Sequence, residues 1–188
     1  MQIVELFGPP GVGKTTLARA VAFRPRGLPA SPAVPLGPYR MAYDVLRTHM
    51  TDRLRSRMAF TGRLLAGVEG IVAHVGRGCW LLEEGCAQRA NVLALIDVPV
   101  ATRAAYVDAL PTGPLTICLC LADAETIAYR GAHRGRHGLT PEQAPLSIEA
   151  CVWTAELLER RGATVHRFDM LRPVAETAAR LREILHAA

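Results

Sequence analysis

Residues 8–15 carry the sequence feature that most constrains what this chain can fold into. They read G-P-P-G-V-G-K-T and fit the Walker A pattern G-x-x-x-x-G-K-T. An apolar strand is predicted directly before them, over Gln2–Phe7, and a helix directly after them, over Thr16–Ala22. Since the pattern has meaning only between a strand and a helix, we predict a phosphate-binding loop here.

The chemistry of such a loop depends on its backbone. Small residues let the amide groups curl around a phosphate, and the helix that follows points its positive end at the same anion. Lys14, the only lysine in the chain, would reach the β- and γ-phosphates, and the Thr15 hydroxyl would bind Mg²⁺. We expect the following residues to contact the nucleotide: Gly8, Pro9, Pro10, Gly11, Val12, Gly13, Lys14, Thr15 and Thr16.

Composition excludes several alternatives. The lone lysine leaves no place for the Asn-Lys-x-Asp motif of ordinary GTPases. The longest apolar run, Leu115–Ala122, is far shorter than a membrane span, and Glu5 interrupts any secretory leader. Five cysteines in no framework spacing read as free thiols. We therefore expect a cytoplasmic protein with no membrane partner. The net charge of +5 suits anionic ligands but does not by itself indicate nucleic acid. The oligomeric state stays open.

Strand and helix patterns alternate along the rest of the chain. Continuous apolar runs of this kind are typical of strands buried on both faces of a parallel sheet. The alternation predicts a single α/β domain over residues 1–188, with an acceptor-binding helical region at about 36–75 and a lid at about 130–140. Strands are predicted at 79–82, 115–121 and 163–168, and helices at 41–75, 87–97, 100–110, 124–130, 146–161 and from Pro173 onward.

Two adjacent carboxylates follow one of these strands. Glu83 and Glu84 would lie where ligands gather in a parallel sheet, at the carboxyl ends of the strands. One would bind Mg²⁺ and the other would accept a proton from an attacking hydroxyl. The sequence leaves open which does which, and we take Glu83 as the metal ligand and Glu84 as the base as the working hypothesis. Asp123, after the next strand, is interpreted as the N-cap of a helix.

Arginines gather in two places. Residues 130–138 combine three glycines with Arg130, Arg134 and Arg136, which suits a closing lid that places positive charge over a migrating phosphoryl group. Arg53 and Arg57 share a helical stripe and form either an anion-binding wall or a solvated charged face. The residues that we expect to bind an acceptor are Arg40, Arg53, Arg57 and Arg89.

At this point the chain resembles the small P-loop kinases of the nucleoside and nucleotide kinase group, such as the thymidylate, adenylate and shikimate kinases. The resemblance rests on Gly8–Thr15, on Glu83-Glu84-Gly85, on the run LTICLCLADAETIAYRGAHRGR at 115–136, and on Pro173 before a closing helix. It covers about two-thirds of the chain. After the acidic pair the chain departs from the Gly-Phe-Pro-Arg of adenylate kinases, because it reads Gly-Cys-Ala-Gln-Arg.

The resemblance implies a P-loop NTPase fold, with five parallel strands, helices on both faces and an arginine-rich lid. It implies ATP and Mg²⁺ as cofactors and a small-molecule acceptor held by the helices between the first and third strands. It places Arg130 against the adenine or the phosphates, with Arg134 and Arg136 closing over them and the loop from Met170 to Pro173 bordering the adenine.

The function we expect is therefore a kinase that moves the γ-phosphoryl group of ATP to a small molecule, such as a nucleoside or nucleotide. Two alternatives stay open at this stage. One is a nucleotide-dependent regulatory ATPase that acts on a protein partner. The other is a polynucleotide 5′-kinase, for which the arginines between residues 40 and 63 would bind the strand.

Overall fold

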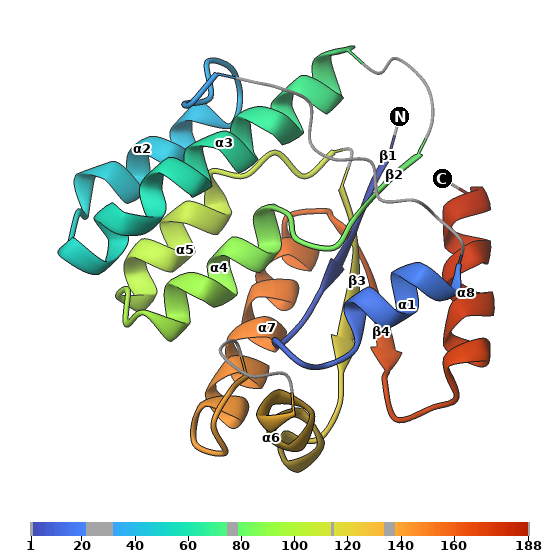
Figure 1. The fold of residues 1–188 in the computed structure, drawn as a ribbon. Helices are drawn as coiled ribbons and strands as arrows, with labels where there is room; N and C mark the ends of the chain where they lie inside the picture. The colour runs from blue at the N-terminus through green and yellow to red at the C-terminus, as the bar shows by residue number, and fades with distance from the viewer. Residues whose placement is uncertain (1, 22–31, 75–78, 114, 134–137, 188) are drawn as a thin grey trace.

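A four-stranded parallel sheet forms the centre of the molecule (Figure 1). The computed structural model describes residues 2–21, 32–74, 79–113, 115–133 and 138–187. The strand order is β2-β1-β3-β4, and every neighbouring pair is parallel. The strands are β1 (Gln2–Phe7), β2 (Cys79–Leu82), β3 (Leu115–Leu121) and β4 (Thr164–Asp169).

The expected number of five strands is wrong for the described part of the chain. The resemblance required another strand between β1 and β2, but the described residues of that stretch form helices instead. The four strands that the apolar runs predicted are all present within a residue of the expected bounds. The physical reason is that the segment between β1 and β2 carries helical periodicity and no continuous apolar run.

Helices cover both faces of the sheet. The face beside α2, α3, α4, α5 and α7 holds the larger apolar core, in which Ile3, Phe7 and Ile117 are buried. The opposite face packs against α1, α6 and α8 through Val4, Leu6 and neighbours. The helices are α1 (Lys14–Ala20), α2 (Arg40–Thr48), α3 (Asp52–His74), α4 (Cys86–Leu95), α5 (Val100–Asp108), α6 (Ala124–Ala132), α7 (Gln143–Arg160) and α8 (Val174–Ala187).

The helix predicted over 41–75 is two helices. Leu46, Leu54 and Met58, which define the predicted apolar stripe, are buried in the core. Met50, on the same stripe, lies in the break between α2 and α3 and is 37% exposed. The hydroxyl of Thr51 accepts the backbone N–H of Leu54, so a side-chain cap starts α3 at this point.

The carboxyl ends of all four strands lie at one edge of the sheet, which places the loops that follow them side by side. The phosphate loop follows β1, the acidic pair follows β2, α6 follows β3 and the loop at Met170 follows β4. Asp123 caps α6 as predicted, because its carboxylate accepts the N–H of Thr126 at 2.6 Å. No helix in the described ranges is both long and apolar enough to cross a bilayer.

Candidate active site

The loop from Gly8 to Thr15 has the backbone shape that its glycines permit. Gly11 and Gly13 have φ angles of 88° and 115°, which L side chains rarely adopt. A side chain at Gly8 would collide with the carbonyl oxygen of Cys120 on β3. The loop is therefore pressed against the sheet, and α1 begins at Lys14 with its first amides directed to the loop.

Lys14 lies folded back over this loop. Its Nζ donates to the carbonyl of Gly8 at 2.7 Å and to that of Pro9 at 3.1 Å. Burial lowers the pKa of Lys14, and the nearby carboxylates of Glu84 and Glu5 are among the groups that counter this effect. The ammonium group is thus held at the mouth of the loop by two neutral acceptors, which a phosphate oxygen can replace.

Thr15 and Glu83 come together at the carboxyl end of β2. The Thr15 hydroxyl donates to Glu83 Oε2 at 2.7 Å, so a side chain from α1 meets one that follows β2. Both offer oxygen atoms, the ligands that Mg²⁺ prefers, and Mg²⁺ commonly takes only one or two protein oxygens beside substrate phosphates. Within the described ranges, no group of three or more His, Cys, Asp or Glu side chains is placed to hold a metal ion.

A pocket of about 170 Å³ joins these residues. Glu84 is exposed and lines it, whereas Glu83 beside it is half-buried. The two carboxylates therefore differ in exposure, and Glu83 is the one that Thr15 contacts. The lining residues are Pro10, Gly11, Gly13, Lys14, Thr15, Glu83, Glu84, Gly131 and Gly138.

Arg130 reaches the phosphate loop from α6. Its Nη1 donates to the carbonyl of Val12 at 3.0 Å, and its Nη2 approaches the carbonyl of Met170 at 3.5 Å. The Met170 side chain would touch a side chain at Gly13. One guanidinium group thus links the phosphate loop to the loop after β4.

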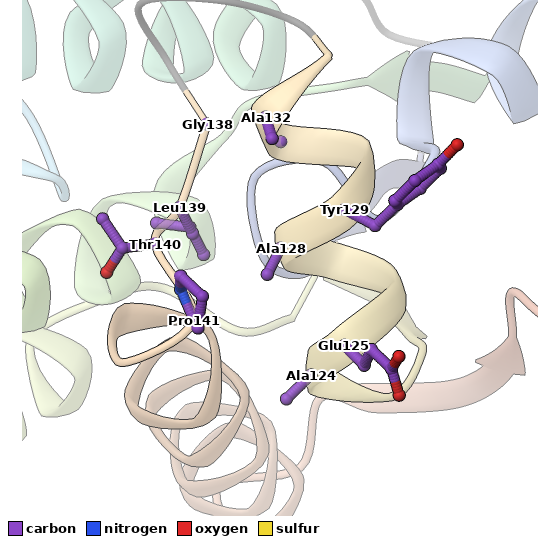
Figure 2. A pocket seen from close by; sticks show the side chains of 10 residues that line it. Ala124, Glu125, Ala128, Tyr129, Ala132, Gly138, Leu139, Thr140 and Pro141 are labelled. Carbon is purple, nitrogen blue, oxygen red and sulfur yellow. The ribbon is translucent and has the colours of Figure 1, made fainter.

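The backbone is closely packed where the predicted lid begins and ends. A side chain at Gly138 would overlap the carbonyl of Gly131, so the backbones at the end of α6 and before α7 touch. The remaining predicted lid residues, Arg134 and Arg136, lie outside the described residues. Figure 2 shows a second pocket of about 720 Å³, between α6 and the segment from Gly138 to Pro141; it shares Gly131 and Gly138 with the pocket at the phosphate loop.

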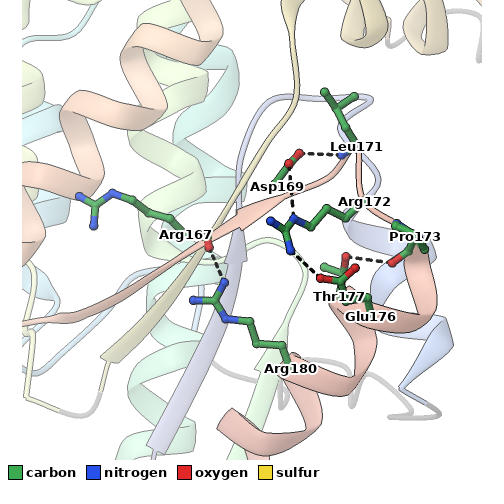
Figure 3. Close-up of polar contacts among 8 residues, drawn as sticks. All are labelled: Arg167, Asp169, Leu171, Arg172, Pro173, Glu176, Thr177 and Arg180. Carbon is green, nitrogen blue, oxygen red and sulfur yellow. Dashed lines mark hydrogen bonds and ion pairs between the residues drawn. The ribbon is translucent and has the colours of Figure 1, made fainter.

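Pro173 directly precedes α8. Its carbonyl accepts the backbone N–H groups of Glu176 and Thr177. Figure 3 shows Arg172, in the loop between β4 and α8, beside acidic side chains of both elements. Its Nη1 donates to Glu176, and its Nε lies 3.8 Å from Oδ2 of Asp169. Of the predicted adenine border, Met170 is therefore the residue that contacts the phosphate loop and Arg130.

The four predicted acceptor arginines have different surroundings. Arg40 pairs with Asp44 at 2.8 Å within α2, and Arg53 pairs with Asp97 at 2.9 Å, with both side chains largely exposed. These two charges are already engaged at the surface. Arg57 is exposed, and its charge contributes to lowering the pKa of Arg89, which places the two side chains near each other.

Arg89 is the exception, because it is only 5% exposed. Its guanidinium group lies 4.7 Å from the ring centroid of Phe60 on α3, a cation–π contact. Its Nε is buried without a hydrogen-bond partner among the described residues. Burial lowers the pKa of Arg89, and Glu84 and Tyr106 are among the groups that counter this. Since a buried cation without an acceptor is costly, this arrangement suits a ligand oxygen.

Sequence reasoning missed Glu5, Gln88 and Phe60. Glu5 lies in β1, is fully buried, and accepts the backbone N–H groups of Gly85, Ala87 and Gln88. Burial raises the pKa of Glu5 to about 7, against the lowering effect of these three amides and of Lys14. The signal was present, since an acid in the middle of a strand flanked by apolar residues demands a buried partner. For Phe60, no local pattern shows that its ring meets Arg89.

Comparison with known proteins agrees with this geometry. A model of the ATPase family associated with various cellular activities (AAA) matches residues 4–32, which include β1, the phosphate loop and α1. No curated protein matches in sequence. Deoxyadenosine kinase from M. mycoides with bound dATP is 14% identical with a TM-score of 0.58, over 98% of this chain and 100% of that chain.

Further solved structures match with similar identities and TM-scores. The same kinase with products dCMP and a flexible dCDP bound gives 13% identity and a TM-score of 0.60, over 100% of both chains. YorR protein from Bacillus subtilis, in complex with phosphorylated GDP, gives 13% identity and a TM-score of 0.51, over 100% of this chain and 99% of that chain. The chain has the fold of the small P-loop kinases. At these identities the likeness establishes the P-loop kinase fold alone, as the resemblance of the sequence implied.

Proposed function

We propose that this protein is an ATP- and Mg²⁺-dependent phosphotransferase that moves the γ-phosphoryl group of ATP to a small-molecule acceptor, of the nucleoside or nucleotide class. The observation that carries the proposal is the convergence of Lys14, Thr15 and Glu83 at one pocket, at the carboxyl ends of β1 and β2. A phosphate loop alone serves many activities, whereas this pocket is also lined by Glu84, whose charge acts on the buried guanidinium group of Arg89 in α4.

On the donor side, the amides of the phosphate loop and the start of α1 bind the phosphates. Lys14 exchanges its two carbonyl partners for phosphate oxygens and stabilises the charge that develops during transfer. Thr15 and Glu83 would hold Mg²⁺, which supplies charge neutralisation across the β- and γ-phosphates. Arg130, bonded to Val12 and Met170, braces the loop beneath the donor.

On the acceptor side, Glu84 takes the proton of the attacking hydroxyl. The acceptor oxygen then forms a bond to the γ-phosphorus while the bond between that phosphorus and the β,γ-bridging oxygen breaks, and ADP leaves. An acceptor that is itself a phosphate brings an ionised oxygen and needs no such base.

Arg89 favours an acceptor that carries an anionic or strongly hydrogen-bonding oxygen. Its guanidinium group lies over the ring of Phe60, and its buried Nε has no hydrogen-bond partner among the described residues. A carboxylate or phosphate matches these donors better than a neutral hydroxyl does. The kinases of similar fold are described with nucleotides bound, which supports nucleosides and nucleotides as the first acceptors to test.

The test is ADP formation from Mg-ATP with matched pairs of acceptors. Each nucleoside is assayed beside its 5′-monophosphate, and neutral sugars beside sugar acids, with an oligonucleotide bearing a 5′-hydroxyl as a further acceptor. Acceptor-dependent ADP formation that is lost in Lys14→Met supports the proposal. Binding of ATP without transfer to any acceptor would contradict it, and end-labelling of the oligonucleotide alone would favour a polynucleotide kinase.

A further inference from the structure

Glu5 is a carboxylate in the middle of a sheet. Residues of β1 alternate between the two faces, and Ile3, Glu5 and Phe7 share the face covered by α4. Ile3 and Phe7 pack into the apolar core there, whereas Glu5, with no exposed surface, meets the beginning of α4. A carboxylate removed from water in this way requires several good donors.

The donors are the free amides at the start of α4. Glu5 Oε1 accepts the N–H of Gln88 at 2.7 Å and of Gly85 at 3.1 Å, and Oε2 accepts that of Ala87 at 3.1 Å. The first amides of a helix have no partner within the helix, and Gly85 at the N-cap has no side chain to cap them. A side chain at Gly85 would overlap the Glu5 carboxylate. The cap of α4 therefore comes from a strand 80 residues earlier in the chain.

The same helix start is tied to the phosphate loop. Gln88 Oε1 accepts the backbone N–H of Gly8 at 3.3 Å, and Gly8 is the first residue of the loop. Glu84 directly precedes Gly85, and Arg89 directly follows Gln88. The buried carboxylate of Glu5 thus bonds the turn at 85–88. This turn lies between Glu84 and Arg89, and it is tied to the phosphate loop through the side chain of Gln88.

We propose that Glu5 is a positioning residue for phosphoryl transfer: its carboxylate fixes the turn from Glu84 into α4 against the phosphate loop, so that Glu84 and Arg89 face the site of Lys14. The inference rests on the proposed kinase function. Glu5 touches no substrate, and it acts through the turn at 85–88. A cap that only stabilised the fold would alter the folded fraction and leave the folded enzyme's kinetics unchanged.

The experiment compares Glu5→Gln with a destabilised control. Gln keeps the size of Glu but turns an amide N–H₂ toward the helix amides, so the turn cannot keep all three bonds. Leu158→Ala is the control, because Leu158 is fully buried in α7 and bonds Ala163 at the opposite edge of the sheet from the phosphate loop. Rates are measured at a temperature at which circular dichroism shows both variants to be folded.

We expect kcat of Glu5→Gln to fall at least about tenfold and the KM for the acceptor to rise, while the Kd of a fluorescent ATP analogue changes less than about threefold. These ranges correspond to the loss of hydrogen bonds to a charged group. Leu158→Ala keeps the parent kcat and KM. Adding Gln88→Leu to Glu5→Gln causes no further loss, because both changes break one network. A folded Glu5→Gln variant with the parent's kcat and acceptor KM would overturn the inference.

Amide hydrogen exchange separates this inference from the proposed function. If the parent enzyme transfers phosphate to no acceptor, the proposed function fails, and the exchange of the peptide spanning 83–90 still decides the role of Glu5. Faster exchange there in Glu5→Gln but not in Leu158→Ala supports a positioning role at the turn. Equal exchange in both variants refutes it.

Discussion

The phosphate loop and the arginine side of α4 hold their cations in opposite ways. Lys14 is held by carbonyls of its own loop, only five and six residues away in the chain. Arg89 on α4 depends on Phe60 from another helix, and its Nε has no partner among the described residues. Lys14 is therefore positioned by a local motif, whereas the surroundings of Arg89 are assembled from distant segments of the chain.

This contrast predicts that the largest loss of activity comes from Lys14. Lys14→Met removes the ammonium group at the mouth of the loop, and we expect phosphoryl transfer to fall by about 10²–10³-fold, the usual effect of removing one group that stabilises developing charge. Acceptor-dependent ADP formation measures this. A variant as active as the parent would refute a donor site built on Lys14.

Glu5 lies between the phosphate loop and α4, and its titration should change how the free energy of unfolding depends on pH. Its pKa is raised from 4.5 to about 7 in the fold, so between these pH values the folded state binds more protons than the unfolded state. Its contribution to the free energy of unfolding therefore falls as pH rises through this window, by about 3 kcal/mol in total. Urea unfolding of the parent minus that of Glu5→Gln, from pH 4 to pH 8, measures it; a flat difference would contradict it.

Glu83 tests the metal end of the donor side. Glu83→Gln keeps the hydrogen bond with Thr15 within reach but removes the charge, so we expect the Mg²⁺ concentration for half-maximal activity to rise at least about tenfold. Titration of activity with Mg²⁺ at fixed ATP measures this. Glu84→Gln is the matched comparison, because it should lower kcat without shifting the Mg²⁺ requirement; identical profiles would remove the distinction between the two carboxylates.

Arg89 and Arg53 test the acceptor side, and the smallest effect is expected for Arg53. Arg89→Met keeps an apolar chain beneath Phe60 but removes the donors, so the KM for an anionic acceptor should rise by about 10- to 100-fold with ATP affinity unchanged. Arg53→Met removes an exposed ion pair with Asp97 and should alter KM by less than about twofold. Equal effects of the two variants would show that Arg89 is no more engaged with the acceptor than a surface arginine.

The phosphate loop could be predicted from sequence because the contacts that shape it and hold Lys14 are short-range. The glycines, Lys14 and Thr15 follow from one pattern, and Asp123 caps α6 from three residues away. The continuous apolar runs also located the strands. The resemblance was wrong on one point that no residue pattern supported, because it implied five strands and the described chain has four.

The acceptor side could be predicted only in part. The stripe of Arg53 and Arg57 marked a basic face of α3, but nothing local shows that Asp97 pairs with Arg53. The contact of Arg89 with Phe60 joins two helices, and the bond from Glu5 to Gln88 spans 83 residues. Such pairings depend on how α3 and α4 pack on the sheet, which periodicity does not specify.

The contact between Gly131 and Gly138 has a consequence for how this protein could be altered. The backbones of Gly131 and Gly138 touch, so the residues that flank the stretch from 132 to 137 lie next to each other. Both glycines line both pockets. Lengthening that stretch would add only slowly growing closure entropy and would leave the two glycines in place. The junction thus offers a position for inserting new sequence beside the two pockets without rebuilding the sheet.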